Sequence, residues 1–528
     1  MKYLLSTFPG VLGSPTVSLE SQCRAFWSMF KYKNPDHCIY KSGKNLARCL
    51  PLNLYGDEGR GPKRALFLEM SCETAFGIFP HKGGCSCNAE LQKVPTSAIP
   101  HCVADSFGPE VAVAEGLSTN LKGHSYLTKH LIFGLPSYLY KEHEAILQKH
   151  LQLLSEDMCH LYETGIQLGE SLWHGVLIGV KGDMKFHAET CCRFDRYHAN
   201  LGKIADLMMC PFCHAGQQGM PFEELDDTPL WTNSMFATRP WPADDSPHLA
   251  TIPYDSFGRQ EAMFSLGPFH VSKVGLIRDV VGSLLVIMCR VGFFDTASDS
   301  RDINERLTRA HGSFRLWCAA NHKSPGLRSF TRAYLNAKTF STSPWTNSKG
   351  SDSMRLAKWL CFYTGLMLET EPQGLERFLR VARKVLQNII GMHELLESHG
   401  LFLPRPCAQL LYVKMMTICR GYHMLAQMGL HDFRMISFAL KPKYHGLKHL
   451  AWDLKIQIER GSPLVLSPNM NSCESNEDCV GRICVLARRV STRTIGFRVI
   501  QRFFLKSRAL FVRHRKKHGP GFLYDKNM

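Results

Sequence analysis

The sequence predicts an α/β protein in which a mixed sheet, flanked by helices, is interrupted by a large all-helical insertion. Three observations support this prediction. Two apolar runs in the first 200 residues end at Gly-Asp and have the length of buried strands. From about residue 270 to 438, the apolar residues instead repeat at helical spacing. The chain has 528 residues, 45% of them hydrophobic, and is long enough for two to four domains or for one domain with a large insertion.

The first apolar run alternates along the chain and stops at Asp57. Strand-like content resumes over residues 65–78 after a glycine-rich turn, which favours a hairpin. Residues 79–136 are rich in Gly, Pro, Cys and Ser, and predict an irregular loop. The alternative is a second small metal site, because Cys85, Cys87 and Cys102 lie near His81 and His101 in the sequence. We therefore expect Asp57 to end the first strand of the hairpin.

The second apolar run, residues 172–180, predicts a buried strand that follows an amphipathic helix over residues 142–168. Asp183 lies at its carboxyl end. A carboxylate there costs desolvation unless a cation or hydrogen-bond donors meet it, and crevices at strand ends are where such sheets bind ligands. A turn-forming Gly-Asp is the simpler interpretation of Asp183 alone.

Two half-sets of zinc ligands lie far apart in the sequence. Cys210 and Cys213 form a C-x2-C, whose thiolates can both reach one tetrahedral zinc. His445 and His449 are four residues apart on one face of a predicted helix that begins near Pro442. Each pair alone is ordinary, but together they make one Cys2His2 set. We therefore predict a structural Zn²⁺ that joins the two ends of the helical insertion, with His214 as a reserve ligand.

These patterns divide the chain into five parts: a packed N-terminal lead-in (1–45), the first part of a sheet-containing core with the Cys-rich segment (46–260), the helical insertion (261–437), the return of the core (438–490) and a basic C-terminal tail (491–528).

The net charge of +17 and the pI near 9.1 indicate an anionic partner. Nucleic acid is favoured over a membrane, because the longest apolar run, residues 280–289, contains Gly282 and Ser283 and is too short to span a bilayer. Residues 482–517 contain twelve Lys or Arg and no Asp or Glu, with phenylalanines between them. A solvated basic helix is one interpretation. We favour a face that contacts DNA phosphates, through Arg513, Arg515, Lys516 and Lys517.

The element order is hairpin, helix, strand with an acid, long helical interruption and then an acid on a helix. This is the order of an RNase H-like fold with an insertion. Phosphoryl transfer with two metal ions needs carboxylates from distant positions, and Asp57, Asp183 and Glu477 would serve. The spacing leaves Glu474 and Asp478 open as the third acid. We prefer Glu477, because Gly481 follows it within a helix-like run.

In this order of motifs the chain resembles the DDE transposases of the CACTA type, which are related to the catalytic subunit of the V(D)J recombinase. The resemblance rests on the three acids, the C-x2-C after the second acid, the histidine pair before the third, and Pro268-Phe-His270-Val-Ser-Lys273, which is similar to a Met-His-x-x-Lys segment of that group. It implies a nuclear protein that cleaves DNA strands and transfers them, with catalytic Mg²⁺ or Mn²⁺ and structural Zn²⁺.

The sequence also departs from that group. Such transposases carry a DNA-binding module upstream, whereas this chain has only about fifty residues before Asp57, as in a truncated or domesticated copy. A catalytically inactive, transposon-derived DNA-binding or structural protein is therefore the alternative, and a zinc-stabilised helical scaffold is a third interpretation. The sequence leaves open whether the protein is a homo-oligomer.

Overall fold

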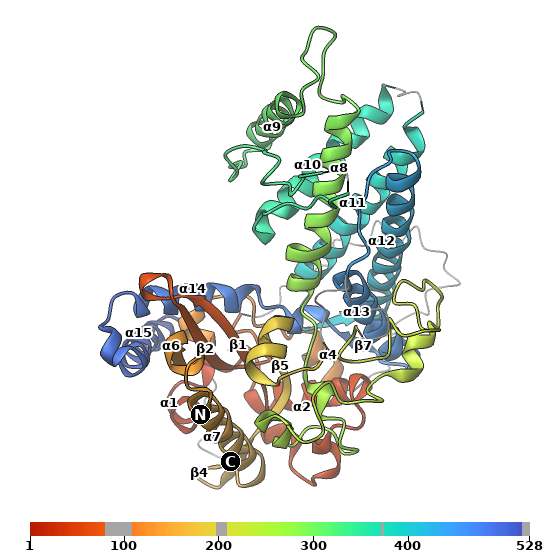
Figure 1. Ribbon diagram of the computed structural model, residues 1–528. Coiled ribbons are helices and arrows are strands. Elements are labelled where there is room, and N and C mark those ends of the chain that lie inside the picture. The colour runs from red at the N-terminus through yellow and green to blue at the C-terminus, as the bar shows by residue number, and fades with distance from the viewer. Residues whose placement is uncertain (80–107, 197–208, 340, 371–373, 520–528) are drawn as a thin grey trace.

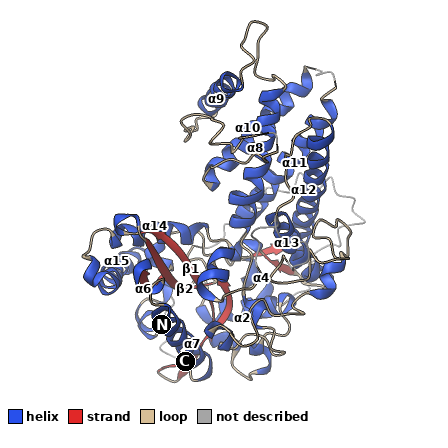
Figure 2. Ribbon diagram, in the orientation of Figure 1, coloured by secondary structure: helices blue, strands red, loops and turns tan. Residues whose placement is uncertain are grey.

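The computed structural model describes residues 1–79, 108–196, 209–339, 341–370 and 374–519. A part that contains the sheet and an elongated bundle of helices make up the molecule (Figure 1), and the strands are confined to the former and to the base of the bundle (Figure 2). Within the described ranges, no helix has the length and apolar character needed to cross a membrane. The predicted α/β class with a mixed sheet is confirmed.

The main sheet has five strands in the order β3-β2-β1-β5-β4. Its central strand β1 (Cys49–Arg60) pairs antiparallel with β2 (Leu66–Thr74), and β2 pairs antiparallel with β3 (His130–Pro136). On its other side β1 pairs parallel with β5 (Ser171–Lys181), which forms a hairpin with the short β4 (Ile166–Leu168). The hairpin and the buried strand expected from the sequence are present.

Two details of the prediction were wrong. Strand β3 lies in the segment predicted as an irregular loop, because its short apolar run ends at Pro136 and is surrounded by Gly- and Pro-rich sequence. Residues 108–129 of that segment contain two short helices, and residues 80–107 lie outside the described residues. Asp57 also lies inside β1 and does not end it, because pairing with β2 continues to Arg60.

Helices cover both faces of the sheet. Helix α2 (Leu19–Lys33) buries Phe26, Trp27 and Phe30, so the N-terminal segment is packed, as predicted. Helix α7 (Glu144–Glu163) packs on β5. The other α-helices described in the first 150 residues are short: α1 (Lys2–Thr7), α4 (Pro109–Glu115), α5 (Ser125–Thr128) and α6 (Ser137–Tyr140).

Among the described residues of the predicted insertion, five α-helices are present: α8 (Ile277–Arg290), α9 (Ile303–Ala320), α10 (Gly350–Glu369), α11 (Glu376–Ser398) and α12 (Arg405–His431). Their apolar faces pack α8 on α10, α10 on α11 and α11 on α12. Figure 1 shows this bundle rising from the sheet, with α9 near its far end. At its base, β6 (Phe402–Pro404) pairs with β7 (Leu464–Leu466) from the returning chain.

The chain returns through α13 (Pro442–Glu459), α14 (Glu474–Ala487) and α15 (Ile495–His518). Helix α13 packs on α12, and α14 packs on β1. Helix α15 lies along β3 and buries Val499, Phe503 and Phe511. The basic segment is therefore a helix docked on the edge of the sheet, and only part of its phenylalanines face solvent.

Candidate functional site

The parallel pairing of β1 with β5 brings the two predicted aspartates to one edge of the sheet. The last residue pair of the β1–β5 ladder is Tyr55 with Lys181. Asp57 and Asp183 each lie two residues beyond this pair, on the two neighbouring segments of backbone. Asp57 therefore lies on β1, and Asp183 follows the end of the adjacent parallel strand β5 in the same mixed sheet.

A single aromatic ring explains why a glycine precedes each aspartate. The Phe186 side chain is buried and packs against the backbone at both Gly56 and Gly182. A Cβ atom at Gly56 would lie 2.0 Å from Cζ of Phe186, and a Cβ atom at Gly182 would lie 2.5 Å from Cδ1 of the same ring. Real Cβ contacts are not this short, so both positions need glycine for the ring to sit there.

Both aspartates are held by donors from nearby residues. The Tyr55 hydroxyl donates to Asp57 Oδ2 at 3.1 Å, and the Glu58 N–H donates to Oδ1 at 2.6 Å. The Phe186 N–H donates to Asp183 Oδ1 at 2.6 Å, at the start of a π-helical segment, Phe186–Cys191. These bonds fix the direction of each carboxylate before any ligand arrives.

The third carboxylate of the site comes from α14. Burial, and then the charges of Glu477 and Asp183, raise the pKa of Asp57 to about 8. The charge of Glu477 also contributes, after burial and Asp57, to a raised pKa of Tyr55. The structure therefore places Glu477 and Asp183 near enough to Asp57 for their charges to oppose its ionisation.

The two other acids of the cluster point elsewhere. Glu474 pairs with Lys273 at 2.9 Å, and Asp478 pairs with Arg482 at 2.7 Å and accepts from the Ser125 hydroxyl. Of the three candidates for the third acid, only Glu477 is among the charges that raise the pKa of Asp57. The geometry therefore favours Glu477 over Glu474.

A fourth carboxylate, Glu69, was not predicted from the sequence. It stands opposite Asp57 in the β1–β2 register and is fully buried. Burial raises its pKa to about 8; a Ser71 hydrogen bond opposes this rise, and the charges of Asp57 and Glu477 add to it. In the sequence, Glu69 stands out only as an acid inside the apolar run of β2. Without the register of β2 on β1, the sequence does not show whether its side chain faces the site or solvent.

Two cations flank the carboxylates. His270 Nε2 lies 3.3 Å from Glu477 Oε1. Burial disfavours its imidazolium, but Cys473 and Glu477 beside it outweigh burial and raise the pKa of His270 to about 10. Burial lowers the pKa of Lys443, at the start of α13, and the charges of Asp279 and, less strongly, Asp183 oppose this lowering. The positive charges of His270 and Lys443 therefore offset part of the negative charge of Glu477 and Asp183.

A buried ionic cluster fixes α14 against the sheet. Glu73 on β2 pairs with Lys181 at 2.6 Å and with Lys129, and all three side chains are at most 2% exposed. The amide of Asn476 donates to Glu73 at 3.2 Å. Because Asn476 precedes Glu477, this bond helps to set where the third acid lies.

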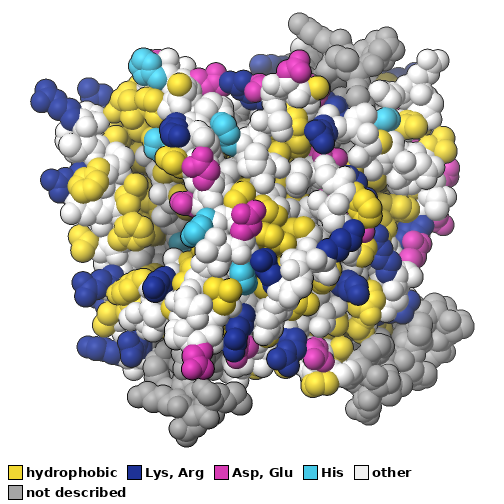
Figure 3. Space-filling model, turned by 90° about the horizontal axis from the view of Figure 1, so that it is seen from below, with side chains coloured by type: hydrophobic (Ala, Val, Ile, Leu, Met, Phe, Trp, Pro, Cys, Tyr) yellow, Lys and Arg dark blue, Asp and Glu magenta, His cyan; other side chains and the backbone are white. Residues whose placement is uncertain are grey.

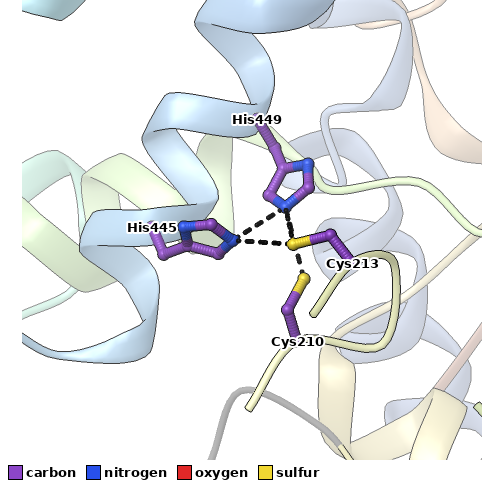
Figure 4. A group of neighbouring side chains, drawn as sticks. All are labelled: Cys210, Cys213, His445 and His449. Carbon is purple, nitrogen blue, oxygen red and sulfur yellow. Dashed lines mark hydrogen bonds between the residues drawn. The ribbon is translucent and has the colours of Figure 1, made fainter. Parts of the chain in front are cut away.

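The predicted Cys2His2 set is assembled as one buried group (Figure 4). The two histidines project from successive turns of α13 toward a loop that carries both cysteines. All four ligand atoms lie within 4.8 Å of one another. The contacts between sulfur and imidazole nitrogen are 3.2 to 3.5 Å, and the two nitrogens are 2.9 Å apart. Around a tetrahedral zinc such atoms would be roughly 3.3 to 3.8 Å apart, so the group could hold zinc.

Neighbouring groups orient the histidines. His445 Nδ1 lies 3.3 Å from the carbonyl oxygen of Phe222, which directs Nε2 to the cysteines. The Trp231 ring packs on both imidazoles, with centroids 4.8 Å from His445 and 4.7 Å from His449. His214 is directed to Thr238 instead, with 3.2 Å between Nε2 and Oγ1, so the reserve ligand is not part of the group.

The basic residues predicted to contact DNA lie on the last turns of α15. Arg513, Arg515, Lys516 and Lys517 are all exposed. Figure 3 shows Lys and Arg side chains projecting from the left-hand edge of the molecule, the side on which α15 lies in Figure 1, next to hydrophobic patches. Phe497 and Phe504 of the same helix are exposed by 69% and 54%.

No protein-family model and no curated protein sequence matches the chain. Within the described ranges, the Cys2His2 group is the only set of three or more Cys, His, Asp or Glu whose ligand atoms all lie within 4.8 Å. The oxygens of Asp57, Asp183 and Glu477 therefore do not all lie within 4.8 Å of one another.

The raised pKa of Asp57 predicts a pH-dependent penalty on folding. The carboxyl ionises near 3.8 in the unfolded chain and near 8 in the folded protein, so its contribution to stability is full below pH 4 and is lost as the pH rises toward 8. In chelator, Asp57→Asn should melt about 2–4 °C above wild type at pH 8 and equal it near pH 4. Thermal unfolding followed by circular dichroism measures this difference. Asp157→Asn on the exposed face of α7 is the control, and a gap that does not change with pH would contradict the assignment.

Proposed function

We propose that the protein is a DNA strand transferase, or its nuclease half-reaction, with an RNase H-like core and a DDE carboxylate set. The observation that carries this proposal is that Asp183 and Glu477, from distant parts of the chain, lie near enough to Asp57 at one edge of the sheet for their charges to raise its pKa. The strand order supports it as well, since a central strand between an antiparallel hairpin and a parallel partner is the arrangement expected of that core.

The residues fit a divalent cation of the Mg²⁺ or Mn²⁺ type. Both ions prefer carboxylate oxygens. The pKa of Asp57 is raised because burial and two neighbouring acids oppose its charge, and a bound cation would relieve that repulsion. When bound, such an ion supplies Lewis-acid activation of a water or hydroxyl for attack on phosphorus. Asp57 and Asp183, held by Tyr55 and Phe186, would be its ligands on the sheet.

His270 and Lys443 would orient the remaining parts of the site. In this proposal His270 holds the Glu477 carboxylate toward Asp57, and the positive charge of Lys443 beside Asp183 attracts a DNA phosphate. Lys273, between Glu397 and Glu474, ties the start of α14 to the helical insertion.

Zinc in the Cys2His2 group would act as a structural clasp. The cysteines and histidines are separated by more than 230 residues, which include the whole insertion. Closing such a loop costs chain entropy that grows only logarithmically with length, whereas zinc–thiolate and zinc–imidazole bonds can contribute on the order of 10 kcal/mol. The clasp would hold α13 against the core, and α14 is the next α-helix in the chain, after the short strand β7.

A catalytically inactive, transposon-derived DNA-binding protein is the second candidate. The observation that favours it is the contact of Glu477 with His270, whose pKa of about 10 makes it a cation that already neutralises this acid. Both candidates share the fold and the basic helix, so only the chemistry of the acids separates them.

Removing the charge of a site carboxylate should separate DNA cleavage from DNA binding. Asp183→Asn and Glu477→Gln should each reduce Mn²⁺-dependent cleavage of plasmid DNA by more than about 100-fold, since even changes outside the first ligand shell cost metal sites 10- to 100-fold. Binding to duplex DNA should be unchanged.

Glu474→Gln is the matched control, because Glu474 faces Lys273 and should leave the cleavage rate near that of wild type. Cleavage that survives in Asp183→Asn would refute the catalytic assignment, and a wild type without cleavage under any divalent ion would favour the inactive candidate.

The metal content of the purified protein tests the clasp. Wild type should carry about one zinc per chain, and Cys210→Ser with Cys213→Ser should release it, because neither thiolate ligand remains. Atomic emission spectrometry gives the stoichiometry. His214→Ala and Cys361→Ser, which lie outside the group, should keep the zinc. Equal zinc in wild type and in the double variant would end this hypothesis.

The salt dependence of DNA binding tests helix α15. Neutralising Arg513, Arg515, Lys516 and Lys517 to Gln should flatten the slope of log affinity against log salt, by up to about 0.9 for each DNA phosphate that the helix no longer neutralises. Neutralising exposed basic residues of α11 (Arg377, Arg380 and Lys384) provides the control, measured by fluorescence anisotropy on the same duplex. An unaltered slope in the α15 variant would make this segment a solvated helix.

A further inference from the structure

A cavity of about 620 Å³ lies within the helical insertion, apart from both sites described above. It is bounded by the end of α8, the start of α9 and the segment that follows α12. Four arginines line it, Arg290, Arg301, Arg306 and Arg332, and the only carboxylate among the described residues of its wall is that of Asp432.

Part of this positive charge has no carboxylate to balance it. Arg306 is balanced, since it pairs with Asp295 at 2.6 Å. Arg332 donates to the carbonyl oxygens of Ala337 and Lys338. These neutral acceptors orient its guanidinium group but do not neutralise its positive charge. Among the described residues no carboxylate lies within ion-pairing distance of Arg332.

Two of the guanidinium groups also oppose each other. Burial lowers the pKa of Arg290, and the charge of Arg332 lowers it further. An anion in the cavity would be attracted by the exposed guanidinium groups of Arg301 and Arg332 on its wall. Guanidinium groups bind phosphate oxygens through paired hydrogen bonds.

The rest of the wall is apolar. It is formed by residues of α8 and α9 and by the segment after α12: Val286, Ile287, Val291, Leu307, Phe433 and Met435. The volume lies in the range of about 300 to 1,000 Å³ that small-molecule sites have. A ligand that fits must therefore combine an anionic group with a flat or apolar body.

From the arginines, the apolar wall and the volume, we propose that this cavity binds a nucleoside phosphate, with the phosphate on the arginines and the base against the apolar wall. The nucleotide could come from solution or from bound DNA, and the chemistry of recognition is the same. The proposal does not depend on cleavage by the carboxylates and holds if they are inactive.

Calorimetric titration of the full chain with ATP tests the proposal. A chelator in the buffer removes divalent ions, so that ATP cannot bind through a metal ion at the carboxylates of the candidate site. ATP should bind, and adenosine, which lacks the phosphates, should bind at least about tenfold more weakly. The double variant Arg301→Ala, Arg332→Ala should also bind ATP about tenfold or more weakly, the equivalent of one charge-assisted hydrogen bond. Both positions are exposed, so folding should survive.

The matched control is Arg315→Ala with Arg328→Ala, which removes the same charge from exposed positions of the insertion outside the cavity. Equal ATP affinity in the two double variants, or adenosine bound as tightly as ATP, would overturn the proposal. A short DNA duplex then identifies the source. If the duplex displaces ATP and binds the cavity variant more weakly, the occupant is a nucleotide of DNA, and if ATP stays bound, it is a free nucleotide.

Discussion

The parallel pairing of β1 with β5 is the constraint on which the candidate site depends. Both strands run in the same direction, so their Gly-Asp pairs emerge at the same edge. The Phe186 ring then packs against Gly56 and Gly182, and any larger side chain at either position would push it out. The two glycines and the ring therefore set the separation of Asp57 and Asp183, and the aspartates can act on one ligand only while this packing holds.

The third acid reaches this edge only after the chain has passed through the whole helical insertion. Two attachments compensate for that long excursion. The Cys2His2 group connects the loop after the second aspartate to α13, and the buried Glu73 cluster connects α14 to β2 and β5. Both attachments are buried and both lie within one or two elements of Glu477. Polar contacts therefore add to the apolar packing of α14 in positioning this acid.

The sequence predicted what depends on local patterns and on ligand chemistry. The apolar runs at β1 and β5, the helical spacing of the insertion, and the joining of Cys210 and Cys213 to His445 and His449 all follow from residue type and period. What failed depends on pairing in three dimensions. Glu69 belongs to the site only because β2 brings it opposite Asp57, and β3 was hidden by the Gly- and Pro-rich sequence around it. The inward direction of Phe503 and Phe511 likewise required the docking of α15 on β3.

The most direct test of the central claim is the proton balance of Mn²⁺ binding at pH 7. Asp57 is largely protonated there, because its pKa is about 8, and a cation that it binds must displace that proton. Calorimetric titration in buffers of different ionisation enthalpy should therefore show binding with release of roughly one proton, and Asp57→Asn should abolish both. Mn²⁺ binding without proton release, or binding and release that persist in Asp57→Asn, would contradict a metal site built on this carboxylate.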